Sequence, residues 1–258
     1  MTKTKATTLI AAALLIAAGT ANGQSVEAQR AKAEQGDAEA QYQLGHAYLF
    51  GVGVEEDEAQ AIHWLRQAAE QGHADAQYNL GLAYLRGWGV ERDEAQAAHW
   101  WRKAAEQGHE VAQTLLGLAY TRGWGVEEDH AQAVHWYRKA AEQGYPQAQY
   151  WMGMAYSSGE GVPQNYRIAA EWYRKAAEQG LAEAQYALGL SYTLGRGVEA
   201  DATEAYAWLI LAKAGGEDVT ESLEGLSKHM PPGQIAAAQE LALEIQDRIE
   251  ARKAEQEE

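Results

Sequence analysis

The sequence contains no cysteine, and this absence excludes several kinds of chemistry. Without a thiol, the chain can form no disulfide bond, no cysteine nucleophile, no thiolate metal site and no lipid-modified cysteine. The stability of its fold must therefore come from packing alone. An exported chain without disulfides fits a bacterial periplasm or culture fluid better than a small eukaryotic secreted domain.

Basic residues are also scarce, since 21 lysine and arginine residues stand against 37 aspartate and glutamate residues, a formal net charge of −16. A phosphate backbone repels an acidic surface, so this balance argues against a nucleic-acid partner. The simplest interpretation of the negative charge is solubility.

A hydrophobic run long enough to cross a bilayer is missing as well. The apolar run near the N-terminus, Leu9–Ala18, has ten residues, whereas a membrane-spanning helix needs roughly 20. Two lysines precede this run and small residues follow it, which is the layout of a secretory signal peptide. We therefore predict a signal peptide over residues 1–23, cleaved after Ala21 or Gly23, no stable membrane insertion, and a periplasmic or secreted protein. A permanent transmembrane anchor is the weaker interpretation.

The sequence does contain a repeat with a period of 36 residues. Its five units are 33–68, 69–104, 105–140, 141–176 and 177–212. Four glycine columns recur in every unit and account for 20 of the 26 glycines. Glycine at such fixed intervals marks the architecture of a repeat, and it does not indicate a phosphate-binding loop.

Each unit is predicted to be a helical hairpin. In the first unit, apolar residues recur at helical spacing over 40–48 and again over 61–69. The glycines of the segment 51–54 permit the positive φ that ends the first helix. Asp57 and Gln60 have the spacing of a capping box, which satisfies free N–H groups at the start of the second helix.

We expect the tryptophan of each second helix to form the core. This column comprises Trp64, Trp100, Trp136, Trp172 and Trp208. The glycine inside each first helix, Gly45 in the first unit, costs about 1 kcal/mol relative to alanine. We therefore predict a close helix contact at that glycine, with the small residue Ala61 as its neighbour.

One family shares this pattern of small, aromatic and glycine positions. In the second unit the pattern reads Ala69, Glu70, Gly72, Ala76, Gln77, Leu80, Gly81, Tyr84, Gly87, Gly89, Val90, Trp100, Trp101, Ala104 and Ala105. It resembles the Sel-one-like repeat family, relatives of the tetratricopeptide repeats, and the resemblance covers about residues 33–212. It implies an all-α fold, a right-handed α/α solenoid of five helical hairpins, that serves as a scaffold or adaptor, often at the bacterial envelope.

Capping helices are expected at both ends, because the terminal repeats would otherwise expose apolar surface. Residues 24–32 are predicted to begin a lone N-terminal helix. Residues 213–252 are predicted to form a degenerate C-terminal cap, whose last helix starts at about Gln234. The charged tail 253–258 is expected to fray.

No catalytic residue, metal site or cofactor is predicted. His63, His99 and His135 occupy one repeat column, but packed helices lie about 8–10 Å apart, so these side chains are poorly placed to share one ion. The carboxylates cluster at helix starts, where capping explains them. The sequence has no Gly-x-Ser-x-Gly, His-Glu-x-x-His or Gly-x-x-x-x-Gly-Lys motif.

Trp88 and Trp124 are the leading candidates for binding a partner. They lie between the two glycines of the interhelix turn, where the other units carry Val52, Glu160 and Arg196. A turn position is usually exposed, and an exposed tryptophan is a typical binding anchor. The alternative is that each indole folds over the next repeat.

Alignment of the first helix with a tetratricopeptide helix implies further candidates on its inner, concave face. These are Tyr42, Phe50, Tyr78, Arg86, Arg122, Tyr150, Trp151 and Tyr186. The alternative is that the tyrosines pack between helices.

These observations favour an exported, non-enzymatic scaffold that binds a protein partner. Aromatic platforms also stack on sugars, so binding of an envelope polysaccharide or peptidoglycan is the alternative function. A hydrolase is a remote alternative, because no convergent catalytic set is visible.

Overall fold

The structure is a computed structural model that describes residues 26–257, so the predicted signal peptide lies outside the described residues. It divides the chain into two compact units, with the boundary between Glu128 and Asp129. The described residues form α-helices and no strand, which confirms the all-helical prediction. Within 26–257, no helix combines the length and the apolar character that crossing a membrane requires.

The helices of the two units have closely similar lengths within the array. The N-terminal unit contains α2 (Val26–Glu34), α3 (Ala38–Phe50), α4 (Glu58–Glu70), α5 (Ala74–Arg86), α6 (Glu94–Glu106) and α7 (Glu110–Arg122). The C-terminal unit contains α8 (His130–Glu142), α9 (Pro146–Ser158), α10 (Tyr166–Ala177), α11 (Ala182–Leu194), α12 (Ala202–Ala214), α13 (Thr220–Ser227) and α14 (Pro232–Glu257).

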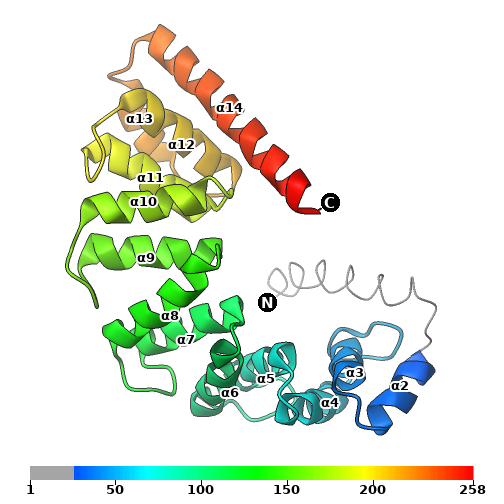
Figure 1. Cartoon of the computed structure of the whole chain (residues 1–258). Coiled ribbons are helices and arrows are strands. Elements are labelled where there is room, and N and C mark those ends of the chain that lie inside the picture. Colours follow the sequence, from blue (N-terminus) through cyan, green and yellow to red (C-terminus); the bar gives the residue numbers. More distant parts are fainter. Residues whose placement is uncertain (1–25, 258) are drawn as a thin grey trace. The chain divides into compact units, whose positions relative to one another are not determined.

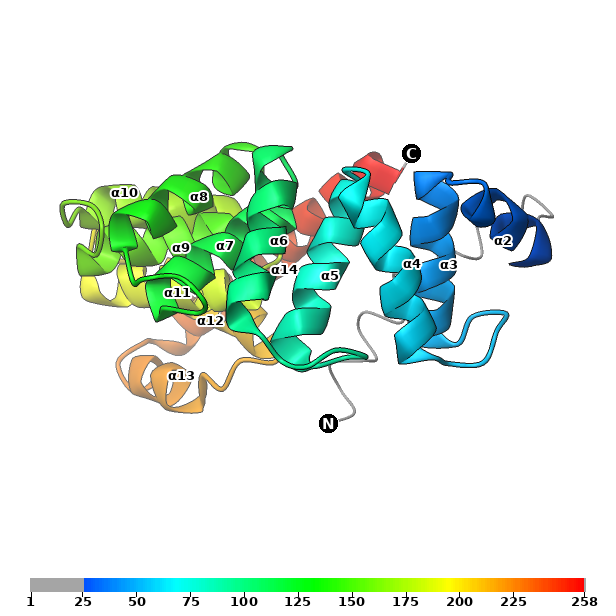
Figure 2. The ribbon, with the colours of Figure 1, turned by 90° about the horizontal axis from the view of Figure 1, so that it is seen from below.

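Within each unit, successive helices pack side by side (Figures 1 and 2). In the N-terminal unit α3 pairs with α4 and α5 pairs with α6, while α4 also packs against α5 and α6 against α7. The same alternation runs from α8 to α12 in the C-terminal unit, where α14 lies along α12. This is the α/α packing expected of stacked helical hairpins.

The second helix of each hairpin begins at a polar cap. The Asp57 carboxylate accepts a hydrogen bond from the backbone N–H of Gln60 at 3.0 Å. Equivalent caps are Asp93, Asp129, Asn165 and Asp201. The backbone N–H of Asp57 donates to the carbonyl of Tyr48 at 3.0 Å. The reciprocal half of the predicted capping box is therefore replaced by a contact between the two helices of the hairpin.

Buried glutamines connect consecutive repeats. The Gln77 amide nitrogen donates to the carbonyl of Ala69 at 3.0 Å, and its amide oxygen accepts from Gln107 at 2.7 Å. The amides of Gln41, Gln113, Gln149 and Gln185 donate to the corresponding carbonyl. Since a buried amide without a partner would destabilise the fold, these bonds make the glutamine compatible with the core.

A second set of contacts joins each second helix to the following first helix. Arg66 donates to the Tyr84 hydroxyl at 3.0 Å, 18 residues further along the chain. The same pair recurs as Arg30 with Tyr48, Arg102 with Tyr120, Arg138 with Tyr156 and Arg174 with Tyr192. The recurring arginine therefore acts as a fixed link between repeats, and each of these guanidinium groups is held in place by a hydroxyl.

Helix α2, the predicted lone N-terminal helix, makes the contacts of a second helix. Its Arg30 and Ala33 precede Arg66 and Ala69 by one repeat period. Arg30 donates to the Tyr48 hydroxyl, and the carbonyl of Ala33 accepts from Gln41 at 3.0 Å. The N-terminal cap is thus built like the second half of a repeat.

The core differs from the prediction at one tryptophan. Trp64, Trp100, Trp136 and Trp208 are buried as predicted. Trp172 is only half-buried, and the ammonium group of Lys175 lies 4.2 Å from its ring centroid. The column that follows the tryptophans is the more enclosed one, and it consists of Leu65, Trp101, Tyr137, Tyr173 and Leu209.

The glycine inside each first helix faces this enclosed column. A Cβ atom at Gly45 would lie 2.8 Å from the Leu65 side chain and 3.0 Å from the carbonyl oxygen of Ala61. At Gly81 the added atom would overlap the Trp101 indole. The predicted close contact is confirmed. The glycine is required by the larger side chain of the enclosed column, such as Leu65 or Trp101, as well as by the small Ala61.

Helix α14 caps the C-terminal unit. Ala242, Ile245 and Ile249 are buried in one cluster with Trp208 and Leu211. The helix continues to Glu257, so the segment that we expected to fray is helical. At its end, Arg252 lies 3.2 Å from a carboxylate oxygen of Glu178.

Candidate functional site

Both turn tryptophans are half-buried. Their backbone N–H groups donate to carbonyls of the preceding helix, Trp88 to Ala83 at 3.0 Å and Trp124 to Ala119 at 2.9 Å. The Trp88 indole also packs against a buried cluster that contains Ile62. The Trp88 side chain therefore packs on its own repeat and on the preceding one, and this cluster contains no residue of the next repeat, over which the alternative interpretation placed the indole.

The first-helix face of the N-terminal unit carries stacked aromatic and histidine rings. Tyr42 stacks on His73 with ring centroids 4.6 Å apart, and Tyr78 meets His109 at 4.9 Å. Both tyrosines are half-buried, so they are neither free anchors nor fully packed residues. Arg86 and Arg122, at the ends of α5 and α7, are exposed.

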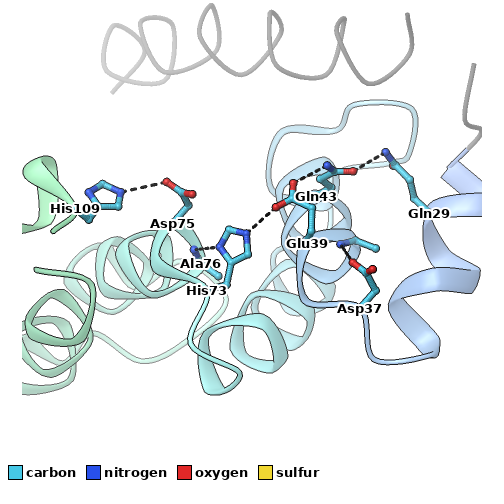
Figure 3. A network of polar contacts seen from close by, with 9 residues as sticks. Gln29, Asp37, Glu39, Gln43, His73, Asp75, Ala76 and His109 are labelled. Atoms are coloured by element: carbon cyan, nitrogen blue, oxygen red, sulfur yellow. Dashed lines mark hydrogen bonds and ion pairs between the residues drawn. The ribbon is translucent and has the colours of Figure 1, made fainter. Parts of the chain in front are cut away.

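A polar network runs along this face (Figure 3). The Gln29 amide donates to Gln43 at 3.0 Å, and Gln43 donates to Glu39 at 2.6 Å. The other oxygen of Glu39 accepts from Nε2 of His73 at 2.9 Å. One repeat further along, Nε2 of His109 lies 3.3 Å from a carboxylate oxygen of Asp75. Carboxylate and imidazole groups thus join neighbouring first helices.

The two histidines are also helix caps. Nδ1 of His73 accepts from the backbone N–H of Ala76, and Nδ1 of His109 accepts from that of Ala112, each at 3.3 Å. A ring nitrogen that accepts cannot carry the proton, so the geometry assigns the proton to Nε2. Both ring nitrogens are therefore occupied by structural hydrogen bonds.

Burial and neighbouring carboxylates shift the pKa values of two groups on this face. Burial, followed by the charges of Asp75 and Glu39, raises the pKa of Tyr42 to about 12. The hydrogen bond from His109 lowers the pKa of Asp75. Neither tyrosine nor carboxylate is thereby tuned toward acid or base chemistry near neutral pH.

His46 occupies the same face and is buried. Its ring centroid lies 4.5 Å from that of Phe50 and 5.9 Å from that of Tyr42. Burial lowers the pKa of His46 below its ordinary value of 6.5. The corresponding residues of the other repeats are Leu82, Leu118, Met154 and Leu190.

We expect the replacement His46→Leu to make the N-terminal unit less sensitive to acid. Because the folded-state pKa is depressed, the unfolded chain binds the proton first. The stability from neutral His46 is complete above the unfolded value of 6.5 and is lost as the pH falls toward the folded value. Urea unfolding at pH 7.5 and 5.5 should show a smaller loss for the variant than for the parent chain. The matched control is His63→Gln, which replaces an exposed histidine of the same unit. An unchanged pH dependence in His46→Leu would assign the acid sensitivity to another group.

The first-helix face of the C-terminal unit is more apolar. Trp151 stacks on Tyr137 with ring centroids 5.8 Å apart and an angle of 13°, and it meets Tyr150 edge-on at 5.5 Å. Its ring is half-buried. One face of the Trp151 ring therefore packs against Tyr137 of α8.

Tyr150 and Tyr186 lie together in a hollow of about 210 Å³. Helices α9 and α11 form its walls, and the buried Tyr173 of α10 forms its floor. Burial raises the pKa of Tyr173 to about 12, so this phenol stays neutral. The rim carries Met154, Leu194 and Arg196, which the sequence analysis did not select.

Within residues 26–257, no group of three or more histidine, aspartate or glutamate side chains could hold a metal ion. The hollow is lined by tyrosine, aliphatic and serine side chains, with Glu183 and Arg196 as its charged residues. These surfaces offer apolar contact, aromatic stacking and charge pairing to a partner.

Comparison with known proteins identifies the repeat. The Sel1 repeat matches residues 38–73, 74–109, 111–145, 146–181 and 182–217. These segments start a few residues after the predicted units, because the starting point in a tandem array is arbitrary. A comparison with curated proteins gave no match.

Solved structures include similar chains. A Sel1 repeat protein from Oxalobacter formigenes is 35% identical, with a TM-score of 0.72 over 81% of this chain and 88% of that chain. A protective antigen of uropathogenic Escherichia coli strains that displays an SLR fold is 32% identical, with a TM-score of 0.59. That match covers 87% of this chain and 56% of the antigen, so the chain spans little more than half of the antigen's length. An immunity protein from Pseudomonas aeruginosa, 24% identical with a TM-score of 0.50 over 80% of this chain and 79% of that chain, shares the fold alone. The repeat match and the similarity to the Oxalobacter protein place the chain in the Sel1 repeat family.

Proposed function

We propose that the chain is an exported, non-enzymatic scaffold that binds another protein through its repeat surfaces. Sel1 repeat proteins are generally scaffolds for protein interaction. The predicted signal peptide over residues 1–23 and the absence of cysteine support a periplasmic or secreted site of action.

The observation that carries the proposal is the half-buried state of the aromatic candidates. Trp88, Trp124, Trp151, Tyr42, Tyr78, Tyr150 and Tyr186 each keep part of the ring at the surface. Aromatic rings that are anchored on one side lose little conformational entropy on binding, and tryptophan, tyrosine and arginine dominate interface energies. Repetition places such rings on the same faces of successive repeats.

The double replacement Trp88→Val and Trp124→Val is expected to weaken binding of the protein partner by about 2 kcal/mol or more. Valine is the residue that the first repeat carries at this position, Val52, so the turn accepts it. The measurement is crosslinking of the purified chain in an envelope extract, followed by titration of the captured protein by calorimetry. Because Trp88 also packs against the core, binding is to be measured well below the melting temperature of both forms.

Two results would contradict the proposed site or function. If the double variant binds its captured partner with the affinity of the parent chain, the turn tryptophans are not the site. If no protein is captured and the chain instead co-sediments with purified peptidoglycan, the chain binds glycan through its aromatic rings. The single variants Trp88→Val and Trp124→Val show whether both indoles contribute.

A further inference from the structure

Most of the exposed large hydrophobic side chains in residues 26–257 line the hollow between α9 and α11. Among the described residues, the large hydrophobic side chains that are exposed are Met154 at 39%, Leu194 at 56% and Leu243 at 67%. Met154 and Leu194 both line this hollow, while Leu243 lies apart on α14. Two exposed apolar side chains at the rim of one hollow mark a contact surface more strongly than scattered ones do.

The size of the hollow restricts what can fill it. Its volume of about 210 Å³ is below the roughly 300–1,000 Å³ of pockets for small molecules and cofactors. The floor is closed by Tyr173 and Ala169, which are 5% and 2% exposed. The space therefore suits one large apolar side chain that is delivered by a chain lying across the rim.

The two ends of the hollow carry opposite charge. Glu183 lies in the first turn of α11 and lines the hollow. Burial, followed by the charges of Glu183 and Glu217, raises the pKa of Tyr150. At the other end, Arg196 follows the C-cap Gly195, and its guanidinium lies 5.5 Å from the Tyr166 ring centroid. Arg196 forms no salt bridge with any described residue, so its N–H groups remain available to a carboxylate.

The separation of these charges sets the length of the bound segment. The eleven residue steps from Glu183 to Leu194, the last residue of α11, span about 17 Å at the helical rise of about 1.5 Å per residue, and Arg196 follows two residues beyond the helix. An extended chain advances about 3.3 Å per residue, so about six residues cover that distance.

We propose that this hollow binds an extended segment of a partner protein, about six residues long, with a large apolar side chain at its centre. One end of the segment carries a lysine or arginine that meets Glu183, and the other end carries an aspartate or glutamate that meets Arg196. The apolar side chain enters between Met154 and Leu194 and contacts Tyr150 and Tyr186. The inference rests on the proposed scaffold function and names the chemistry that the scaffold recognises.

The test uses a displayed library of random decapeptides, selected on the full mature chain. Selected peptides are expected to share a large apolar residue with a basic residue on one side and an acidic residue on the other. Leu194→Asp should reduce the affinity of a selected peptide at least about tenfold, because a carboxylate in the rim must be desolvated. The matched control is Leu243→Asp, which places the same charge on an exposed leucine outside the hollow and should leave the affinity unchanged.

A charge exchange tests the ends of the segment separately. Arg196→Glu should weaken a selected peptide about tenfold, and changing the acidic residue of that peptide to lysine should recover most of the loss. Melting temperatures of these surface variants, followed by circular dichroism, confirm that each variant is folded.

The proposal is overturned if no sequence is enriched, or if enriched peptides bind Leu194→Asp as well as they bind the parent chain. Failure of the hollow and failure of the scaffold function are distinguishable, because the peptide selection does not use the natural partner. A chain that captures a protein through Trp88 and Trp124 but selects no peptide keeps its scaffold function and loses only the hollow.

Discussion

Replacing Trp101 by alanine is expected to destabilise the N-terminal unit by roughly 3–5 kcal/mol, as deletion of a buried aromatic side chain does. The side chain is 0% exposed, and it fills the space that the missing Cβ of Gly81 leaves open. Removal of the indole leaves a cavity that the backbone of α5 cannot close. Repeats couple mainly to their neighbours, so the helices packed against α6 should open first.

Denaturant unfolding followed by circular dichroism measures this loss, and Trp101→Leu is the matched control. Leucine occupies the same column at Leu65 and Leu209. The Trp101 indole N–H has no hydrogen-bond partner in the described residues, so leucine removes no hydrogen bond. The leucine variant should therefore lose clearly less stability than the alanine variant. A loss below about 1 kcal/mol in Trp101→Ala would mean that this column is not the core.

The replacement Gly89→Ala is expected to lower the free energy of unfolding by about 3 kcal/mol or more, which is well above the loss expected for Gly72→Ala. Both glycines have a positive φ, 62° at Gly89 and 96° at Gly72, so alanine is strained by about 1–2 kcal/mol at either position. Only at Gly89 would the added Cβ lie 2.5 Å from the carbonyl oxygen of Glu58, at the start of α4. At Gly72 nothing lies within 4 Å.

The difference between these two variants isolates the contact between neighbouring repeats. Overpacking of a well-packed site costs typically 1–3 kcal/mol, and this term applies to Gly89 alone. The measurement is the midpoint and slope of urea unfolding for both variants and the parent chain. Equal losses of stability in Gly72→Ala and Gly89→Ala would show that the turn at Gly89 is not closely packed against the preceding repeat.

The helical hairpins were predictable because their signals are local. The capping residue Asp57 and the turn glycines Gly51 and Gly53 specify helix ends within a few residues. The hydrogen bonds between repeats were not predicted. Gln107 donates to Gln77, which lies 30 residues away, and Arg66 donates to Tyr84, which lies 18 residues away. The hydrophobic pattern of one repeat does not identify such distant partners. Their recurrence at the repeat period is the signal that could have identified them.

The candidate surfaces were predicted in part. The choice of Tyr150 and Tyr186 came from the family resemblance, and the structure places both in one hollow. Leu194 was missed, although it occupies the same repeat column as Phe50, Arg86 and Arg122, which were selected. Whether a residue of that column faces solvent or a hollow depends on side chains from three helices, and these come together only in the folded chain.

Trp172 shows where a column argument fails. Its equivalents Trp100 and Trp136 are buried, whereas Trp172 is half-buried. Repetition of a residue type predicts its place on the helix, but the degree of burial is set by the neighbouring repeats, which differ in sequence.

The construction of α2 has a consequence for how arrays of this kind change in length. The carbonyl of Ala33 and the guanidinium of Arg30 make the contacts to α3 that Ala69 and Arg66 make to α5. A tandem duplication or an in-frame deletion of one whole unit in the gene would therefore join surfaces that already fit. Copy number can change by recombination in single events, without a compensating change in the cap.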